Sequence, residues 1–256
     1  MKIVIKVGTS TLAHSTGRIN IRRIEQLVKV LSDIKNSGQE IILVSSGAIG
    51  MGVGKLSLKE RPQDMPTKQA ASAVGQCELM YTYDKLFTEY NHIVAQILLT
   101  ATDVEDEKRR LRVENTLERL LSLHVLPVIN ENDTVATEEI SVGDNDTLSA
   151  IVANCARADM LVILSDIDGL YTADPHKDKN ASLISVVEEI TPEIESLAGG
   201  SGSSLGTGGM ATKLKASKLV TKNGIDMVIA NGSDPDILYD ILDGKFKGTL
   251  FKGRKQ

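Results

Sequence analysis

Hydrophobic and polar residues follow two different periods along this chain. Short runs rich in β-branched residues, such as 2–8 (KIVIKVG) and 40–46 (EIILVSS), predict strands. Between them, the spacing over 20–38 predicts an amphipathic helix, with Asn20 as its N-cap and Gly38 as its C-terminal stop. One face of this helix would carry Ile21, Ile24, Leu27, Val28, Leu31 and Ile34.

The same alternation continues to the end of the chain. Further strands are predicted at 92–100, 125–130, 159–166 and 226–231, with a short one near the C-terminus. Further helices are predicted at 65–90, 105–122, 145–156, 210–223 and 235–242. Strands that are apolar throughout and separated by amphipathic helices are typical of a mostly parallel sheet covered on both faces. The predicted fold class is therefore α/β, in a single domain over 1–256, because no long linker divides the chain.

Composition narrows the class of protein. A net charge of -5 argues against a surface that binds nucleic acid. No apolar run reaches the roughly 18 residues of a membrane span, and the N-terminal run is too short for a signal peptide. Cys77 and Cys155 match no metal or redox spacing, and we expect both to be buried free thiols. These features predict a cytoplasmic protein that does not bind membranes.

Four of the predicted strands end in small polar residues. Their carboxyl ends read 6–11 (KVGTST), 45–50 (SSGAIG), 129–134 (INENDT) and 165–172 (SDIDGLYT). Such residues are also good turn formers, so one such end alone would indicate little. Because ligands gather at the carboxyl ends of parallel strands, four of them together indicate a binding site.

The stretch 206–217 (GTGGMATKLKAS) places a lysine in the first turn of a predicted helix. A cation is unfavourable there unless an anion binds at the same helix terminus. On a helical projection Lys213 falls on the apolar side, whereas Lys215, Lys218 and Lys222 form a polar stripe. The sequence therefore predicts a phosphate contact for Lys213, although the loop is not a Walker A motif and no G-x-G-x-x-G follows the first strand.

Lys6 and the run GDND raise the same question from elsewhere in the chain. Lys6 stands at the end of the first strand, where it either extends past the strand end into solvent or neutralises a transferred phosphoryl group. One of Asp144, Asn145 and Asp146 is expected to cap the helix that follows. A remaining aspartate between Lys6 and Lys213 would hold both ammonium groups in position.

The motifs KVGTST, LVSSGAIGMG, NENDTV, GDNDTLSA, GLYTADP and GTGGMATK occur in the order found in the amino acid kinase superfamily. Within it, the chain resembles the glutamate 5-kinases from Lys2 to about Phe251. The resemblance implies a three-layer α/β/α sandwich with a glutamate-binding half over about 1–150 and an ATP-binding half over about 151–256. It also implies transfer of phosphate from ATP to the γ-carboxylate of L-glutamate, the first step of proline biosynthesis. Many members continue into a C-terminal PUA domain, and this chain is expected to be a form without it.

The resemblance also implies a role for each matching residue. Lys6 and Lys213 would stabilise the phosphates, and Asp146 would organise the two lysines. Glutamate would be bound by Ser46, Gly47, Asp133 and Asn145. ATP would be bound by Lys6, Ser165, Asp166, Thr207, Gly208, Gly209, Met210, Ala211, Thr212 and Lys213. Mg²⁺ would accompany ATP, and the sequence singles out no protein side chain as its ligand.

The implied chemistry fits a chain without a candidate general base. A carboxylate nucleophile is already ionised near neutral pH, so catalysis reduces to alignment and charge neutralisation. Two alternatives remain: another superfamily member acting on acetylglutamate, aspartate, carbamate or a nucleoside monophosphate, and a noncatalytic nucleotide or amino-acid sensor. The resemblance further implies a homo-oligomer and feedback inhibition by L-proline.

Overall fold

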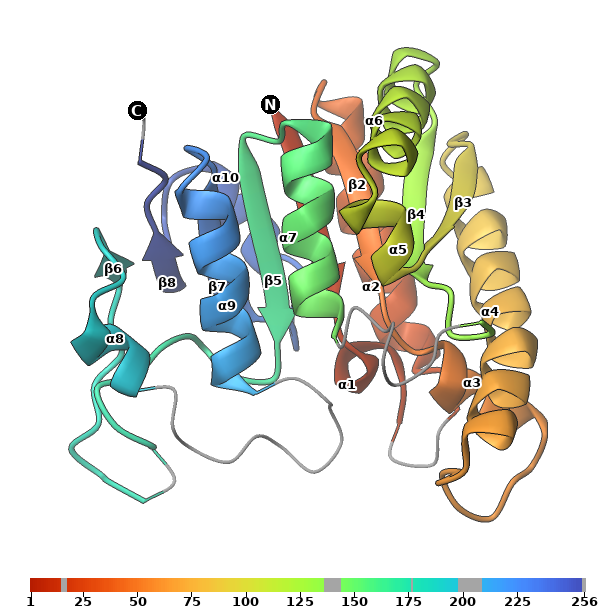
Figure 1. Ribbon diagram of the computed structural model, residues 1–256, viewed down its shortest axis with the longest axis horizontal. Helices are drawn as coiled ribbons and strands as arrows, with labels where there is room; N and C mark the ends of the chain where they lie inside the picture. The colour runs from red at the N-terminus through yellow and green to blue at the C-terminus, as the bar shows by residue number, and fades with distance from the viewer. Residues whose placement is uncertain (15–17, 136–143, 176, 198–208, 255–256) are drawn as a thin grey trace.

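A single mixed sheet forms the centre of the molecule (Figure 1). The computed structural model describes residues 1–14, 18–135, 144–175, 177–197 and 209–254. Within these ranges the sheet has eight strands in the order β3-β4-β2-β1-β5-β7-β8-β6. The strands are β1 (Lys2–Val7), β2 (Glu40–Ser45), β3 (Val94–Leu99), β4 (Leu126–Glu131), β5 (Met160–Ser165), β6 (Val186–Val187), β7 (Asp226–Asn231) and β8 (Gly248–Phe251). All neighbouring pairs are parallel except β7 and β8, so the predicted mostly parallel sheet is confirmed.

Helices cover both faces of this sheet (Figure 1). In the described ranges they are α1 (Thr9–Leu12), α2 (Ile21–Asn36), α3 (Ala48–Lys55), α4 (Met65–Thr88), α5 (Ala101–Glu105), α6 (Glu107–Ser122), α7 (Asn145–Ala156), α8 (Pro192–Ser196), α9 (Met210–Thr221) and α10 (Ile237–Leu242). One apolar cluster joins the sheet to α2, α4 and α10, and a second joins its other face to α6, α7 and α9. The architecture is the expected three-layer α/β/α sandwich.

The alternation of side chains along β1 decides which face receives its lysine. Ile3, Ile5 and Val7 enter the cluster beneath α2, whereas Val4 enters the cluster beneath α7 and α9. Because residues two apart in a strand share a face, Lys6 lies on the side of Val4. The strand therefore delivers Lys6 to the α7 and α9 side, at the carboxyl end of the sheet.

The helix over 21–36 follows its sequence signals closely. Asn20 caps it by accepting a hydrogen bond from the backbone N–H of Arg23, and Gly38 follows its end with a φ of +95°. The prediction was wrong for Ile21, whose surface is 63% exposed, because it lies in the first turn at the margin of the apolar stripe. Cys77 was also predicted to be buried and is exposed, on the outer side of α4, whereas Cys155 is buried as expected.

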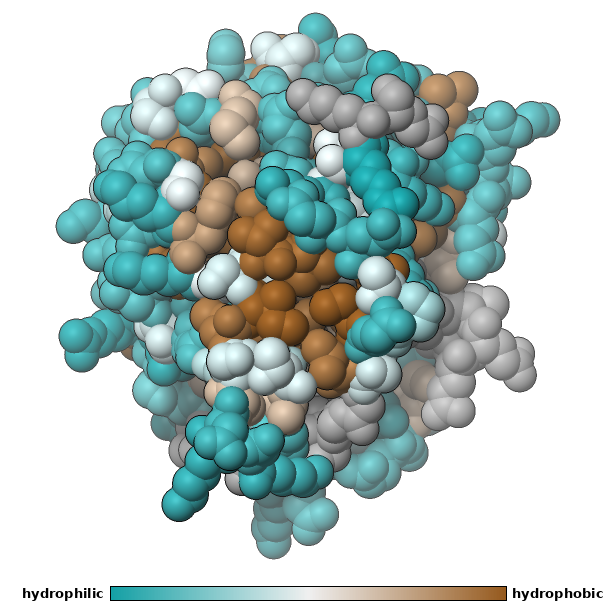
Figure 2. All heavy atoms as spheres, turned by 90° about the vertical axis from the view of Figure 1, so that its left-hand side faces the viewer, coloured by the Kyte–Doolittle hydropathy of each residue, from teal (hydrophilic) through white to brown (hydrophobic). Residues whose placement is uncertain are grey.

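The short strand β6 and the short helix α8 lie at one edge of the sheet. Figure 2 shows an apolar patch on this face of the molecule. The apolar side chains of this edge that keep some exposure include Ile184, Val186, Ile190, Ile194 and Leu197. A two-residue edge strand offers few unpaired backbone groups to another chain.

Across the described ranges, no helix has the length and apolar character that crossing a membrane requires.

Candidate active site

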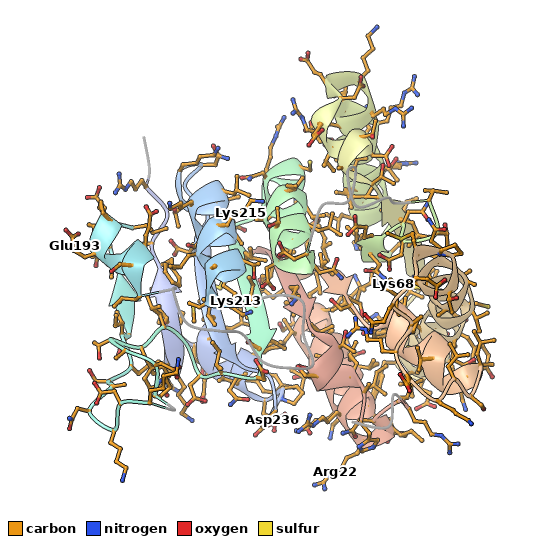
Figure 3. All side chains as sticks on the ribbon, turned by 60° about the horizontal axis from the view of Figure 1, so that its bottom comes forward. Arg22, Lys68, Glu193, Lys213, Lys215 and Asp236 are labelled. Atoms are coloured by element: carbon orange, nitrogen blue, oxygen red, sulfur yellow. The ribbon has the colours of Figure 1, made fainter. Side chains whose placement is uncertain are left out.

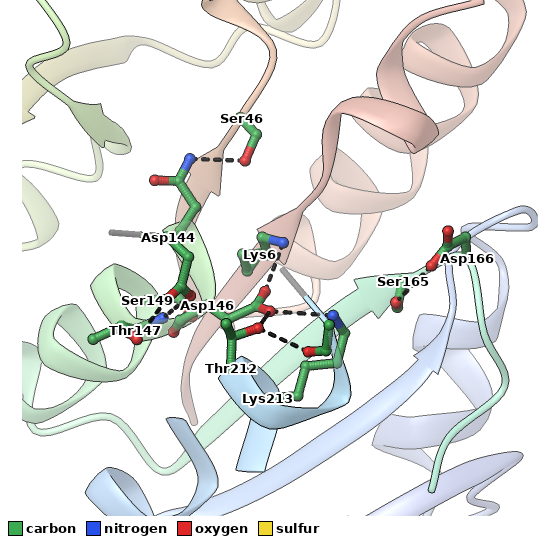
Figure 4. Close-up of polar contacts among 12 residues, drawn as sticks. Lys6, Ser46, Asp144, Asp146, Thr147, Ser149, Ser165, Asp166, Thr212 and Lys213 are labelled. Atoms are coloured by element: carbon green, nitrogen blue, oxygen red, sulfur yellow. Dashed lines mark hydrogen bonds and ion pairs between the residues drawn. The ribbon is translucent and has the colours of Figure 1, made fainter. Parts of the chain in front are cut away.

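Three charged side chains from separate elements meet at the carboxyl end of the sheet (Figure 4). The Nζ atom of Lys6, on β1, lies 2.6 Å from Oδ1 of Asp146, on α7. The Nζ atom of Lys213, on α9, lies 3.1 Å from Oδ2 of the same carboxylate. One aspartate therefore binds both lysines, in the arrangement that the sequence predicted for the surplus aspartate of GDND.

This cluster is nearly closed to solvent. The side chains of Lys6, Lys213 and Asp146 are 11%, 6% and 1% exposed. Burial by itself would raise the pKa of Asp146, but Lys6 and Lys213 beside it hold this pKa below its usual value. The carboxylate is thus ionised, and the two ammonium groups leave the cluster with one excess positive charge. Such a site favours an anion, because charge that is not compensated in a buried site is costly.

The neighbouring residue Asp144 explains why Asp146 is free to bind the lysines. Asp144 caps α7, accepting hydrogen bonds from the backbone N–H of Thr147 at 2.7 Å and from its hydroxyl at 2.9 Å. With the cap supplied by Asp144, the carboxylate of Asp146 can turn toward β1 and α9. The helix is also fixed from inside, since the hydroxyl of Ser149 donates to the carbonyl of Asp146 at 2.7 Å.

Thr212 completes the surroundings of this carboxylate. Its Oγ1 lies 2.8 Å from Oδ2 of Asp146 and 2.8 Å from the carbonyl oxygen of Gly209. The hydroxyl hydrogen can serve one of these acceptors at a time. The resemblance gave Thr212 a place among the ATP-binding residues, and the structure adds a contact with Asp146 that the sequence did not predict.

Two helices near this cluster begin at a glycine. Gly47 is the N-cap of α3, with a φ of +109°, and Gly209 is the N-cap of α9. A glycine has no side chain with which to cap the first amides of a helix, so these N–H groups remain available to an anion. Lys213 is the fourth residue of α9 and adds its charge to the same helix terminus.

A chain of neutral amides lies next to the charged cluster. The side-chain Nδ2 of Asn145 donates to Oγ of Ser46 at 2.7 Å and to Oδ1 of Asn130 at 2.9 Å. The Nδ2 of Asn130 in turn donates to Oε1 of Gln76 at 3.0 Å. Both amide hydrogens of Asn145 are thereby engaged, so its carbonyl oxygen is the atom that can accept a bond from a ligand.

Asp133 stands on the segment after β4, close to this amide chain. Its Oδ2 accepts a hydrogen bond from the hydroxyl of Ser72 at 3.1 Å. Burial raises the pKa of Asp133 to about 6. The hydrogen bond from Ser72 and the charge of Arg61 lower this pKa, whereas the charge of Glu131 raises it further. The carboxyl group can therefore change its charge in the mildly acidic range.

Ser72 and Gln76 reach these positions because α3 and α4 cross in very close contact. A Cβ atom on Gly52 would lie 1.8 Å from the carbonyl oxygen of Ala71, and one on Gly75 would lie 1.8 Å from that of Ala48. No side chain fits at either glycine without moving the backbone. The contact brings the start of α3 and the inner face of α4 to the same end of the sheet.

The residues expected at the nucleotide lie on the other side of the charged cluster. Ser165 ends β5, and its hydroxyl donates to Oδ1 of the exposed Asp166 at 3.2 Å (Figure 4). Met210 is partly buried against the core, and Ala211 is exposed. Thr207 and Gly208 fall outside the described residues.

The lysines of α9 separate into two groups as the helical projection predicted. Lys213 is buried, whereas Lys215, Lys218 and Lys222 are exposed. Lys213 and Lys215 can both be followed on this helix in Figure 3. The stripe of three lysines is therefore a solvated face, and Lys213 is distinct from it.

Comparison with known proteins identifies the family. Residues 1–231 match the Amino acid kinase family. The chain is 54% identical over 258 residues to a glutamate 5-kinase of Clostridium perfringens (strain 13 / Type A), covering 99% of this chain and 96% of that protein. It is also 54% identical over 250 residues to a glutamate 5-kinase of Clostridium acetobutylicum, covering 98% and 94% of the two chains. The chain belongs to the glutamate 5-kinase family.

Solved structures of two other kinases share the fold. Carbamate kinase from Giardia lamblia bound to AMP-PNP aligns with a TM-score of 0.71 at 16% identity, over 99% of this chain and 98% of that one. An isopentenyl phosphate kinase product complex of T. acidophilum aligns with a TM-score of 0.67 at 17% identity, over 98% and 100% of the two chains. The architecture of this glutamate 5-kinase family member is thus the amino acid kinase fold.

Three residues of the site in this glutamate 5-kinase family member were not singled out from the sequence: Ser72, Gln76 and Asn130. Asn130 lies in the strand end 129–134 (INENDT), but the sequence gives no signal that distinguishes it from an ordinary turn-forming residue. Ser72 and Gln76 are four residues apart on a helix, and this spacing was a usable signal that they share a face.

The donors around the charged cluster bear on the site of Mg²⁺. In the part of the chain that the structure describes, no group of three or more His, Cys, Asp or Glu side chains is placed to hold a metal ion. Both oxygens of Asp146 already face lysines. Mg²⁺ is commonly bound through one or two carboxylates and the phosphates of a nucleotide, and such a mode needs no three-carboxylate cage.

Proposed function

We propose that this chain transfers the γ-phosphoryl group of ATP to the γ-carboxylate of L-glutamate, giving L-glutamyl 5-phosphate for proline biosynthesis. Its identity to glutamate 5-kinases over nearly the whole chain supports the substrate. The observation that carries the mechanism is the buried cluster in which Asp146 binds both Lys6 and Lys213. A cluster with one excess positive charge suits a phosphoryl group in transfer.

The proposed reaction needs little acid–base chemistry from the protein. The attacking γ-carboxylate is ionised near neutral pH, so no general base has to remove a proton. In the proposed role, Lys6 and Lys213 neutralise charge on the transferred group, and Asp146 keeps them in position before substrates arrive. The protein must also align the two substrates. The N-termini of α3 and α9 and the buried hydrogen bonds near them support this alignment.

We assign the acceptor to the half of the chain over about 1–150, with Asn145 at its boundary. Asp133 would bind the α-ammonium group of glutamate, because its carboxyl group lies next to Ser72, one helical turn from Gln76 of the amide chain. The carbonyl oxygen of Asn145, the hydroxyl of Ser46 and the backbone of Gly47 would supply further contacts. These residues lie on separate elements, so the pocket would form only in the folded domain.

We assign the nucleotide to the half over about 151–256. Ser165 and Asp166 would lie beside it, and residues 207–213 would surround its phosphates. The buried Lys213 and the glycine start of α9 support this assignment. Mg²⁺ would enter with ATP on the phosphate oxygens, where it supplies further neutralisation of charge.

Two finer parts of the proposal follow from the resemblance rather than from the site. L-Proline would act as a feedback inhibitor, and the protein would work as a homo-oligomer. A cytoplasmic location is consistent with free thiols at Cys77 and Cys155. A net charge of -5 supports a protein without a nucleic-acid partner.

The test is a product assay with purified protein and Mg-ATP. L-Glutamate, N-acetyl-L-glutamate, L-aspartate and no acceptor are compared, with ADP release measured and hydroxylamine added to trap an acyl phosphate as hydroxamate. We expect hydroxamate with L-glutamate alone. Turnover with a different acceptor would keep the kinase mechanism and reject the substrate, and ATP binding without turnover would favour a sensor.

A matched pair of variants on α9 tests the mechanism in the same assay. Lys213→Ala removes the buried ammonium group, and we expect kcat to fall by about 10²- to 10³-fold. Lys215→Ala removes an exposed lysine two residues away and should leave kcat unchanged. Equal activity of the two variants would contradict the role given to Lys213.

A further inference from the structure

Residues 166–171 form the segment that follows β5, and hydrogen bonds hold one side of this segment against β8. A Cβ atom on Gly169 would lie 2.5 Å from Oγ1 of Thr249 on β8, so the backbone of this segment lies directly against that strand. The backbone N–H of Leu170 donates to Oγ1 of Thr249 at 2.8 Å. The hydroxyl of Thr249 donates to the carbonyl of Ile184 at 2.7 Å, which ties in a third segment.

The same segment is fastened on its β7 side by a carboxylate. Oδ1 of Asp168 accepts a hydrogen bond from Nδ2 of Asn231 at 2.8 Å, and Oδ2 accepts one from the hydroxyl of Tyr171 at 2.9 Å. Asn231 is itself oriented, because its Oδ1 accepts a bond from the backbone N–H of Ser233 at 2.9 Å. This hydrogen bond fixes which end of the Asn231 amide faces Asp168.

The strand register places this contact beside the expected nucleotide residues. Asn231 is the last residue of β7 and pairs with Ser165, the last residue of β5. Asp166 and Asp168 then follow in the same segment. The bond between Asn231 and Asp168 therefore joins the two strands just beyond their last backbone pairing, where Ser165 and Asp166 leave the sheet.

We propose that Asp168 and Asn231 are positioning residues for the nucleotide, acting by holding Ser165 and Asp166 in a fixed place. The inference rests on the proposed function, which puts ATP at those two residues. Asp168 does not need to touch the nucleotide, since each of its oxygens already accepts a bond from a protein donor. The contact with Asn231 orders the segment before ATP binds, so binding costs less conformational entropy.

The solvent exposure of Asp168 and Asn231 distinguishes a positioning role from a role in the stability of the whole domain. Asp168 is exposed and Asn231 is only partly buried, and exposed polar contacts contribute little to the stability of a whole domain. Loss of the contact should therefore loosen the segment locally while the domain stays folded. A structural role would instead lower Tm and affect both substrates alike.

The first experiment compares Asp168→Ala, Asn231→Ala and the double variant with the unaltered protein. We expect each variant to raise KM for Mg-ATP by about 10-fold, with KM for glutamate and Tm nearly unchanged. The effects of the two single variants should not multiply in the double variant, because both remove the same bond between Asp168 and Asn231. Asp226→Ala is the matched control: it removes a carboxylate at the opposite end of β7, which accepts a bond from the backbone N–H of Gly253 at 2.7 Å.

A conservative variant and a spectroscopic signal test the contact itself. In Asp168→Asn the amide can still accept from Asn231 and donate to the oxygen of Tyr171, so KM for Mg-ATP should return toward the original value. The bond to Asp168 raises the pKa of Tyr171. Asp168→Ala should therefore move the ionisation of one tyrosine, followed by its ultraviolet absorbance, to lower pH.

The outcomes distinguish this inference from the proposed function. Glutamate-dependent hydroxamate with an unchanged KM for Mg-ATP in both alanine variants would overturn the positioning role and keep the function. A lowered Tm with equal losses for both substrates would also overturn it. If the unaltered protein shows no turnover, equilibrium binding of a nonhydrolysable ATP analogue decides: weaker binding in both variants supports the role, and equal binding overturns it.

Discussion

Asn145 and Asp146 are neighbours in the first turn of α7, yet their side chains enter chemically different surroundings. Asp146 faces two lysines and is almost completely buried. Asn145 faces Ser46 and Asn130, and no ion pair belongs to this chain of neutral groups among the residues described. A single peptide unit thus separates an ionic region from an amide region.

The ionic region around Asp146 and the amide region around Asn145 differ because their proposed tasks differ. A phosphoryl group in transfer carries charge, and fixed charges in a water-poor site act on it strongly. An amino acid is recognised by the placement of its groups, and neutral hydrogen bonds provide direction without the desolvation cost of a buried charge. Substitutions in the ionic region should therefore lower kcat, and those in the amide region should raise KM for glutamate.

The largest effect is expected from Asp146→Asn. Without the carboxylate, two buried ammonium groups lose their common partner and repel each other. We expect kcat to fall by about 10³-fold or more. Breaking a buried ion pair costs about 3–5 kcal/mol, so denaturant unfolding should show a clear loss of stability.

Asp144→Asn is the control for that variant, two residues earlier in the chain. The side chain keeps an acceptor for the cap of α7, so the change should cost little stability and leave kcat within a few-fold. A loss of kcat as large as that of Asp146→Asn would mean that the helix start, and not the ionic contact, governs the activity.

A somewhat smaller effect is expected from Lys6→Ala. It removes one of two cations and leaves Lys213 paired with Asp146, so we expect kcat to fall by about 10²- to 10³-fold. Lys2→Ala is the matched comparison, because Lys2 shares the strand and the face of Lys6 but lies at the other end. Its ammonium group binds the carbonyl of Ala156 at 2.8 Å. Steady-state kinetics in which the two variants behave alike would reject the role of Lys6.

In the amide region, Asn130→Ala should act mainly on glutamate binding. The change removes an acceptor for Asn145 and leaves Oε1 of the buried Gln76 without its donor. We expect KM for glutamate to rise by about 10- to 100-fold, with KM for Mg-ATP nearly constant. If both KM values rise together, the two regions are not separable and the comparison fails.

The smallest effect is a pH dependence that sharpens the same comparison. Because burial raises the pKa of Asp133 to about 6, this group is ionised above that pH and protonated below it. Only the ionised form can pair with the α-ammonium group of glutamate. We expect kcat/KM for glutamate to fall by about 10-fold per pH unit below pH 6.

The γ-carboxylate of glutamate titrates near pH 4.3, so it does not account for a change near pH 6. In Asp133→Asn the dependence near pH 6 should disappear, and kcat/KM should be low at every pH. A profile in this variant that still bends near pH 6 would assign the titration to another group.

The sequence predicted those features that depend on local pattern. The position of α7 and β7, the cap at Asn20 and the burial of Lys213 follow from periodicity and helix-end chemistry within a few residues. The surplus aspartate in GDND was also a local signal, since one cap residue suffices for a helix. The short elements α1, α5, α8 and β6 escaped prediction because they are too brief to show a period, and α3 because three of its eight residues are glycine.

The contacts of Ser72 and Gln76 could not be predicted in the same way. Gln76 meets Asn130 and Ser72 meets Asp133 across 54 and 61 positions in the chain. These meetings depend on how closely α3 and α4 cross, which the glycines at 52 and 75 permit. A lone glycine in a helix does not reveal in sequence which backbone will lie against it.

The ionic cluster draws its lysines from opposite ends of the chain, and this has a consequence for synthesis on the ribosome. A nascent chain that has emerged only as far as α7 can pair Lys6 with Asp146, and this pair is electrically neutral. The excess positive charge arises only when α9 has emerged and Lys213 has docked. The proposed attraction for phosphates therefore requires α9 to have been made, and of the described strands only β7 and β8 follow it in the chain.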